Sequence, residues 1–163
     1  MTLVRHQGGW IIFLSLVVAL MLTILPLPEW AEYYRPEWPA LVLIYWCMAL
    51  PQRVGVGIGW VVGLLVDVLK GALLGQHALG LAVIAYITLN LHQRIRVFPL
   101  WQQAVTVLVL LALYQLLILW FDGITAGQTS KGWIYWMPSV VSMVLWPWVF
   151  VLLRDLRRRF KVS

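Results

Sequence analysis

The sequence predicts an all-α integral membrane protein of six transmembrane helices, with both ends of the chain in the cytoplasm. Of its 163 residues, 63% are hydrophobic and 11% are charged, and the mean hydropathy is +0.88. Soluble domains carry about 45–50% apolar and about 25% charged residues. A series of apolar runs and an uneven placement of basic residues between them complete the prediction. Because no polar linker interrupts the chain, residues 1–163 are expected to form one multi-span domain.

The first span is predicted over residues 10–27, directly after Arg5 and His6. Its position is that of a signal peptide, but LPLPEWAEYYRPEWP follows it in place of a small-residue cleavage site, so we expect a retained helix. The second span, 38–51, is short for a bilayer, which takes about 20 residues. It is expected either to borrow flanking residues and cross or to be tilted, broken or re-entrant.

The remaining spans are predicted over residues 54–74, 77–92, 100–121 and 133–153. The 54–74 run is long enough to cross, whereas the 77–92 run is again short. The 100–121 run is uninterrupted. The last run contains two prolines, which membrane helices tolerate where neighbouring groups satisfy the freed carbonyls.

The basic residues test this count of six spans. Basic residues flanking membrane spans collect on the cytoplasmic side, so their positions orient the chain and argue against nucleic-acid binding. The three exceptions lie on or near the opposite side, where Glu29, Glu32 and Glu37 also lie. With six spans, nine of the twelve Lys and Arg residues share one side: Arg5, Arg53, Arg94, Arg96, Arg154, Arg157, Arg158, Arg159 and Lys161.

The segment GVGIGWVVGLLVDVLKGALLG has a small residue or an acid at every fourth position. In lipid, helices associate through close packing, which small residues spaced by four permit. Each step of four drifts by about 40° around the helix, so the row turns by about 200° and is expected to meet more than one neighbour. Helix packing is the simplest interpretation of the glycines, and a helix end is the alternative. The row consists of Gly55, Gly59, Gly63, Asp67, Gly71 and Gly75.

Asp67 is the exception in this row, because a carboxylate near the middle of a bilayer costs about 2.5–3.5 kcal/mol. A helix that enters at Val54 places it about 20 Å in, on the periplasmic half. It therefore needs a partner, and a polar lock between helices or chains is favoured over a site for a transported proton. The candidate partners are Lys70, His77, Tyr86 and Gln115.

The sequence offers no motif for catalysis, for a cofactor or for a metal. The three histidines, His6, His77 and His92, are scattered at predicted span ends. The single Cys47 lies in an apolar run, which excludes disulfides and cysteine-based metal sites. No phosphate-binding loop follows the glycines. An enzyme is therefore not expected.

Two basic segments are candidates for contacts in the cytoplasm. HQRIRVFPLWQQ (92–103) is predicted to be a basic, aromatic loop in which Arg94 and Arg96 contact a partner or anionic lipid headgroups. The C-terminal RDLRRRFK has the same two interpretations. Topology alone also accounts for the charges of both segments.

Several segments, in order along the chain, carry a resemblance to a known family: Arg35-Pro36, YWCMALPQRVGVGIGWVVGLLVDVLKGALLGQHAL (45–79), AYITL (85–89), RIRVFPLWQQ (94–103) and LWPWVF (145–150). The chain resembles the MreD family of rod shape-determining membrane proteins of Gram-negative bacteria from about Trp10 to Arg159. The polar stretch 122–132 is the least similar part.

This resemblance implies an inner-membrane component of the elongation machinery, without established catalytic activity. Members of the family partner with MreC, a single-span periplasmic protein, and act with the MreB filament. The same assembly contains the glycosyltransferase RodA and a class B penicillin-binding protein, which build side-wall peptidoglycan. The six-helix fold is similar to that of the substrate-binding subunits of energy-coupling-factor vitamin transporters.

The leading hypothesis is a membrane scaffold that holds the MreC span against the groove of Gly59, Gly63, Asp67, Gly71 and Gly75. A small-molecule transport subunit is the alternative, and a lipid-handling helper near peptidoglycan precursors is a third reading. Transport needs a polar pocket, for which the candidates at membrane depth are Asp67, Thr88, Asn90, Gln115 and Ser142.

Overall fold

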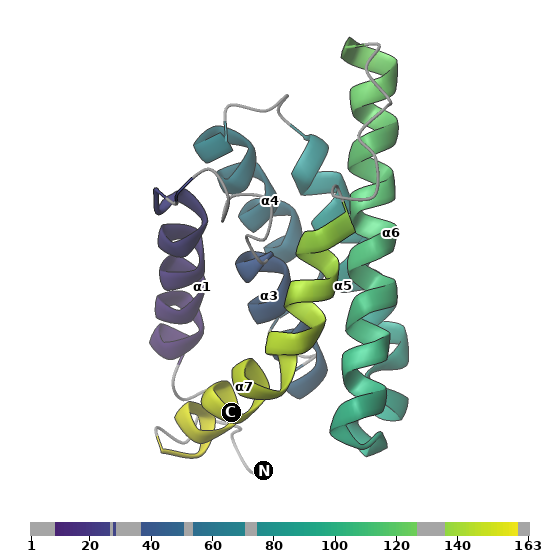
Figure 1. The fold of residues 1–163 in the computed structure, drawn as a ribbon. Coiled ribbons are helices and arrows are strands. Elements are labelled where there is room, and N and C mark those ends of the chain that lie inside the picture. The colour runs from purple at the N-terminus through teal and green to yellow at the C-terminus, as the bar shows by residue number, and fades with distance from the viewer. Residues whose placement is uncertain are drawn as a thin grey trace.

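The computed structural model describes residues 9–26, 28, 37–50, 54–70, 75–126 and 136–159, which form six helices and no strand. The predicted all-α class is therefore confirmed. Figure 1 shows the helices running alternately up and down, so that the start of α1 and the end of α7 lie at the same end of the bundle. The helices are α1 (Gly9–Ile24), α3 (Trp38–Ala49), α4 (Val56–Lys70), α5 (Gln76–Val97), α6 (Leu100–Ala126) and α7 (Met137–Arg159).

Helix α3 is the centre of the bundle. Every residue from Pro39 to Leu50 is buried, and α1, α5, α6 and α7 all contact this helix. The indole nitrogen of Trp46 donates a hydrogen bond to Ser15 Oγ over 2.8 Å, which ties α3 to α1. Twelve residues rise only about 18 Å. This short helix is apolar on all sides because protein surrounds it on all sides.

Helix α5 is longer than the predicted fourth span and continues through Arg94 to Val97. The predicted loop over 92–103 is wrong: only Phe98 and Pro99 separate α5 from α6. Gln103 explains the tight turn, since its Nε2 donates to the carbonyls of Ile95 (3.0 Å) and Phe98 (3.3 Å). It thereby satisfies carbonyls at the end of α5 that have no partner within the helix.

Two of the described helices are long and apolar enough to cross a membrane, α6 over Leu100–Phe121 and α7 over Met137–Arg159. Shorter apolar helices cover Trp10–Ile24, Trp38–Ala49 and Val56–Leu69. Figure 1 shows that α7 changes direction along its length, and Pro147 lies inside it. Proline removes a hydrogen bond from the helix ladder and kinks it. The count of six membrane spans stays a prediction.

Candidate functional site

The glycine row of α4 packs against α5 of the same chain. A Cβ atom built on Gly59 would lie 3.0 Å from Leu81 O and 3.1 Å from Ala85 Cβ. One built on Gly63 would lie 2.5 Å from Ala78 N and 2.6 Å from His77 O, and nearer still to Ala78 Cα. The two backbones therefore touch where side chains are absent. The face predicted to receive a partner helix is occupied here by α5.

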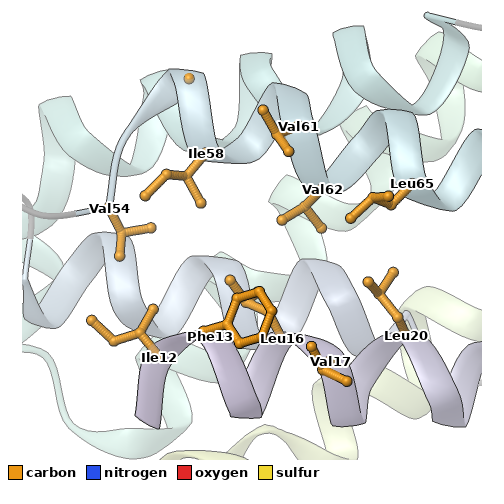
Figure 2. Close-up of a pocket in the computed structure, with 11 residues that line it drawn as sticks. Ile12, Phe13, Leu16, Val17, Leu20, Val54, Ile58, Val61, Val62 and Leu65 are labelled. Atoms are coloured by element: carbon orange, nitrogen blue, oxygen red, sulfur yellow. The ribbon is translucent and has the colours of Figure 1, made fainter. Parts of the chain in front are cut away.

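A different glycine of α4, Gly57, has no close contact with another helix. A Cβ on Gly57 would meet nothing within 4 Å, and Gly57 lines a groove of about 650 Å³ between α1 and α4. Figure 2 shows the apolar side chains of the two helices on either side of this groove, among them Phe13, Leu16, Val61 and Leu65. We call it the α1–α4 groove. Its walls are apolar and contain one small residue, Gly57.

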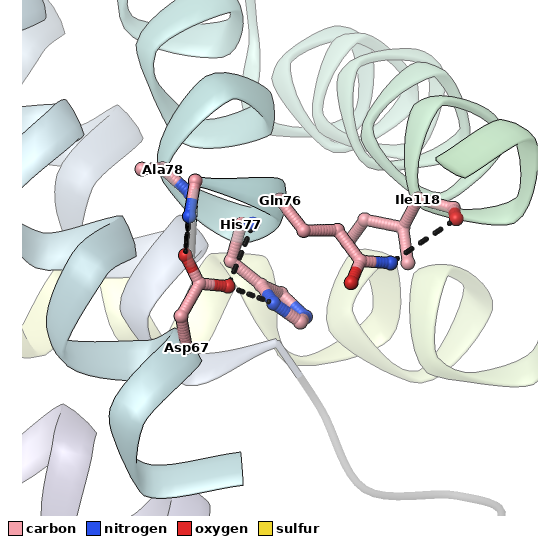
Figure 3. Close-up of polar contacts among 6 residues, drawn as sticks. Asp67, Gln76, His77, Ala78 and Ile118 are labelled. Atoms are coloured by element: carbon pink, nitrogen blue, oxygen red, sulfur yellow. Dashed lines mark hydrogen bonds and ion pairs between the residues drawn. The ribbon is translucent and has the colours of Figure 1, made fainter. Parts of the chain in front are cut away.

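Asp67 lies near the end of α4 and is completely buried. Its Oδ2 accepts hydrogen bonds from the backbone N–H groups of Gly75 (2.9 Å) and Ala78 (3.4 Å). Its Oδ1 accepts one from the backbone N–H of His77 (2.8 Å) and lies 2.7 Å from His77 Nδ1. Figure 3 shows the carboxylate directed at the first turn of α5. Asp67 is therefore the acceptor for the start of the next helix.

The geometry follows from what the start of a helix lacks. The first four N–H groups of a helix have no intrahelical partner, and an N-cap side chain normally accepts from the second or third of them. Gly75 is the N-cap of α5 and makes no side-chain cap bond. Asp67 takes that role from the neighbouring helix, and its charge also complements the positive end of the α5 dipole.

Polar contacts continue from this cap to α6. Gln76 Nε2 donates to the carbonyl of Ile118 over 3.3 Å, as Figure 3 shows, and the His77 ring centroid lies 6.0 Å from that of Tyr114. The Asp67 cluster, defined as Asp67, Gly75, Gln76, His77 and Ala78, thus joins α4, α5 and α6. A buried polar network of this kind favours one arrangement of the three helices.

Of the predicted partners of Asp67, the structure brings His77 to it. Gln115 pairs instead with Ser139 of α7, and Tyr86 is 61% exposed. The side chain of Lys70 and all of Gly71 lie outside the described residues. Arg94 is exposed on α5, and Arg96 lies in the same helix, although its side chain is not described.

The packing of α5 against the glycines of α4 was not predicted from the sequence. Gly80 packs against the ring of Tyr114, whose Cδ2 would lie 2.6 Å from a Cβ at this position. Ala78 and Ala85, one heptad apart, face Gly63 and Gly59. This second row of small residues was a readable signal that α5 is the helix that fills the groove.

Replacing Gly75 with alanine should lower the free energy of unfolding by about 1 kcal/mol, because its φ of 102° is left-handed. Asparagine tolerates this region better and should cost less. A Cβ would meet no other residue within 4 Å, so contacts with neighbouring side chains do not contribute. Thermal unfolding of the purified protein in detergent measures both variants. Equal losses for alanine and asparagine would contradict the backbone explanation.

The chemistry of the described residues is that of helix contacts. In the described ranges, no group of three His, Cys, Asp or Glu side chains could hold a metal ion. The Asp67 carboxylate accepts from backbone N–H groups at the start of α5, and the His77 imidazole lies against the same carboxylate. The arrangement can fix one helix against another.

Comparison with known proteins agrees with the resemblance noted in the sequence. The family described as rod shape-determining protein MreD matches residues 4–156. The rod shape-determining protein MreD of Haemophilus influenzae is 33% identical over 157 residues, which cover 94% of each chain. No solved structure matches, and the likeness to energy-coupling-factor subunits stays a prediction. On the family match over nearly its whole length, the chain belongs to the MreD family of rod shape-determining proteins.

Proposed function

We propose that this MreD family member is a non-catalytic, multi-pass scaffold in the bacterial inner membrane, with both ends in the cytoplasm. It binds MreC and thereby supports side-wall peptidoglycan synthesis by the elongation machinery. Family membership supports the role in rod-shape determination. The scaffold role and the binding of MreC are inferred from the hydrogen bonds of the polar residues at depth and from the open α1–α4 groove.

The observation that carries the proposal is that four of the five polar residues considered at membrane depth are engaged with neighbouring helices or backbone, whereas Asn90 is exposed on α5. Asp67 caps α5, Gln115 pairs with Ser139, and Ser142 Oγ accepts from the backbone N–H of Glu37 over 3.0 Å. Thr88 bonds the carbonyl of Ile84 in its own helix. A transport subunit needs such groups to face its ligand, whereas a scaffold needs them to hold its helices. Their use here favours the scaffold.

The α1–α4 groove is the surface that we assign to the MreC span. The face of Gly59 and Gly63 is filled by α5, so the partner helix needs another surface. The groove extends from Val54, just before α4, to Leu65 within α4, about three helical turns, and its wall is apolar. Gly57 lets a second backbone come close, as small residues do between helices in lipid.

Replacing Val61 with tryptophan should reduce co-purification of MreC at least about tenfold. The indole would fill the groove and hold the MreC span away from α4. Val61 is 52% exposed in the groove wall. The matched control is Val109→Trp on α6, where the valine is 61% exposed and lies outside the groove. Pull-down from membranes with equal amounts of inserted protein measures both variants.

Two outcomes would contradict this assignment. Unchanged MreC binding in both Val61→Trp and Gly57→Leu would remove the groove from the interface. A small molecule retained by the purified protein in native mass spectrometry, and displaced by Val61→Trp alone, would favour the transport subunit instead.

A further inference from the structure

We propose that the end of α7 and its neighbours form a binding site for a phosphate group, in a pocket separate from the α1–α4 groove. The pocket has a volume of about 410 Å³. Three arginines from the last two turns of α7 line it together with side chains of α3 and α6. The residues used in the argument are Tyr45, Gln103, Phe150, Arg154, Arg157 and Arg158.

The pocket lies at the end of the bundle where α7 finishes and α1 starts (Figure 1). Its walls come from the last turns of α3 and the first turn of α6, besides α7. This is the end that the basic residues place in the cytoplasm. The phosphates of the inner leaflet and those in solution both reach such a position.

The walls of the pocket are held by contacts of their own. The rings of Tyr45 and Phe150 pack edge to face, with their centroids 5.6 Å apart. Gln103 Nε2 donates to the Ile95 carbonyl at the end of α5, and Gln103 Oε1 accepts from Trp146 Nε1 over 3.3 Å. Gln103 is thus a fixed wall, which leaves the guanidinium groups and the Tyr45 hydroxyl as the donors that a ligand would meet.

The arginines lack an anionic partner in the described part of the chain. The close contact between a carboxylate and a basic side chain that is found there joins Asp67 to His77, at the other end of the bundle. Arg154 Nε is shielded from solvent and has no hydrogen-bond partner among the described residues. The Arg154 guanidinium lies 5.7 Å from the centre of the Phe150 ring, and Asp155, the nearest acid in sequence, is exposed. Three like charges around one cavity favour the binding of an anion.

A phosphate group fits this set of donors. The guanidinium fork matches phosphate oxygens with paired hydrogen bonds and remains charged at every physiological pH. Basic residues at the end of a helix also complement its dipole, which accounts for the terminal arginines in part. The helix dipole does not explain why the buried Nε of Arg154 is left without a partner beside a cavity. A phosphate in the pocket would lie close enough to neutralise this group of charges.

Lipid retention by the full-length protein tests the proposal. The protein is reconstituted with phosphatidylglycerol, or with zwitterionic phosphatidylethanolamine, and analysed by native mass spectrometry with and without inorganic phosphate. Arg154→Gln and Arg157→Gln should each weaken anion binding about tenfold, the cost of one charge-assisted hydrogen bond. Arg159→Gln removes the same charge from the same helix end but does not line the pocket, so it should bind as the parent does.

The results separate the two sources of phosphate. Retained phosphatidylglycerol that survives inorganic phosphate and is lost in Arg154→Gln identifies a lipid headgroup. Displacement by inorganic phosphate at low concentration identifies a soluble phosphate. Equal losses in the Arg157→Gln and Arg159→Gln variants, or no binding of either ligand by a parent protein with an intact thermal transition, would overturn the proposal.

Discussion

Replacing Gly63 with alanine is expected to lower the free energy of unfolding by about 2 kcal/mol or more. The added methyl group would meet the backbone of Ala78 and His77, which cannot rotate away as a flexible side chain does. Helices α4 and α5 must then move apart along their whole contact, which also draws the Asp67 cluster out of position. Equilibrium unfolding in detergent measures the loss.

Gly57→Ala is the matched control, because the same change is made six residues earlier in the same helix. No atom lies within 4 Å of its added methyl group. Alanine also favours helix over glycine by up to about 1 kcal/mol, so this variant should be neutral or more stable. Opposite signs for two identical substitutions would establish that the α4–α5 contact, and not helix propensity, sets the effect. Equal effects would contradict the close packing at Gly63.

The helices were predictable where apolar runs are long and uninterrupted. Helix α6 begins at Leu100, as predicted, because hydropathy rises sharply after Pro99. Helix α5 was predicted to end near residue 92, where its sequence turns polar, but it continues to Val97. Its last turn is held by the buried Ile95 and by Gln103 of α6. These tertiary contacts leave no trace in a hydropathy profile.

The glycine row shows the same division between what a sequence can and cannot indicate. Its period of four predicted close packing of helices, and that packing is found at Gly59 and Gly63. The period does not say which helix fills the groove. A neighbour of the same chain is always present at high effective concentration, so it takes such a face before a second protein does. We therefore expect the MreC contact at Gly57 and the α1–α4 groove.

Only part of the surroundings of Asp67 could be predicted from the sequence. The cost of a buried carboxylate predicted a partner, and His77 was among the residues considered. The other donors are backbone N–H groups of α5, which every residue except proline carries and no sequence pattern marks. Only the folded arrangement brings them together. The cluster is therefore a joint between helices whose chemistry comes mostly from the backbone.

Replacing Asp67 with alanine should lower the free energy of unfolding by about 3 kcal/mol, because the N–H groups of Gly75, His77 and Ala78 would lose their acceptor in a buried place. Asparagine keeps one acceptor oxygen but turns an NH₂ group toward the remaining donors. It should therefore cost about half as much. Asp155→Asn, at an exposed carboxylate of α7, should change stability by less than about 0.5 kcal/mol. Unfolding in detergent ranks the three variants.

The same variants decide between the two roles proposed for this carboxylate. If Asp67 serves α5, then Asp67→Asn lowers the thermal transition and the amount of protein in the membrane. MreC binding per folded molecule stays unchanged, since the α1–α4 groove lies on another face of α4. If Asp67 recruits MreC, the thermal transition stays in place while co-purification falls. The second pattern would place Asp67 in the interface with MreC. It would also mean that the MreC span displaces α5 from α4 in the complex.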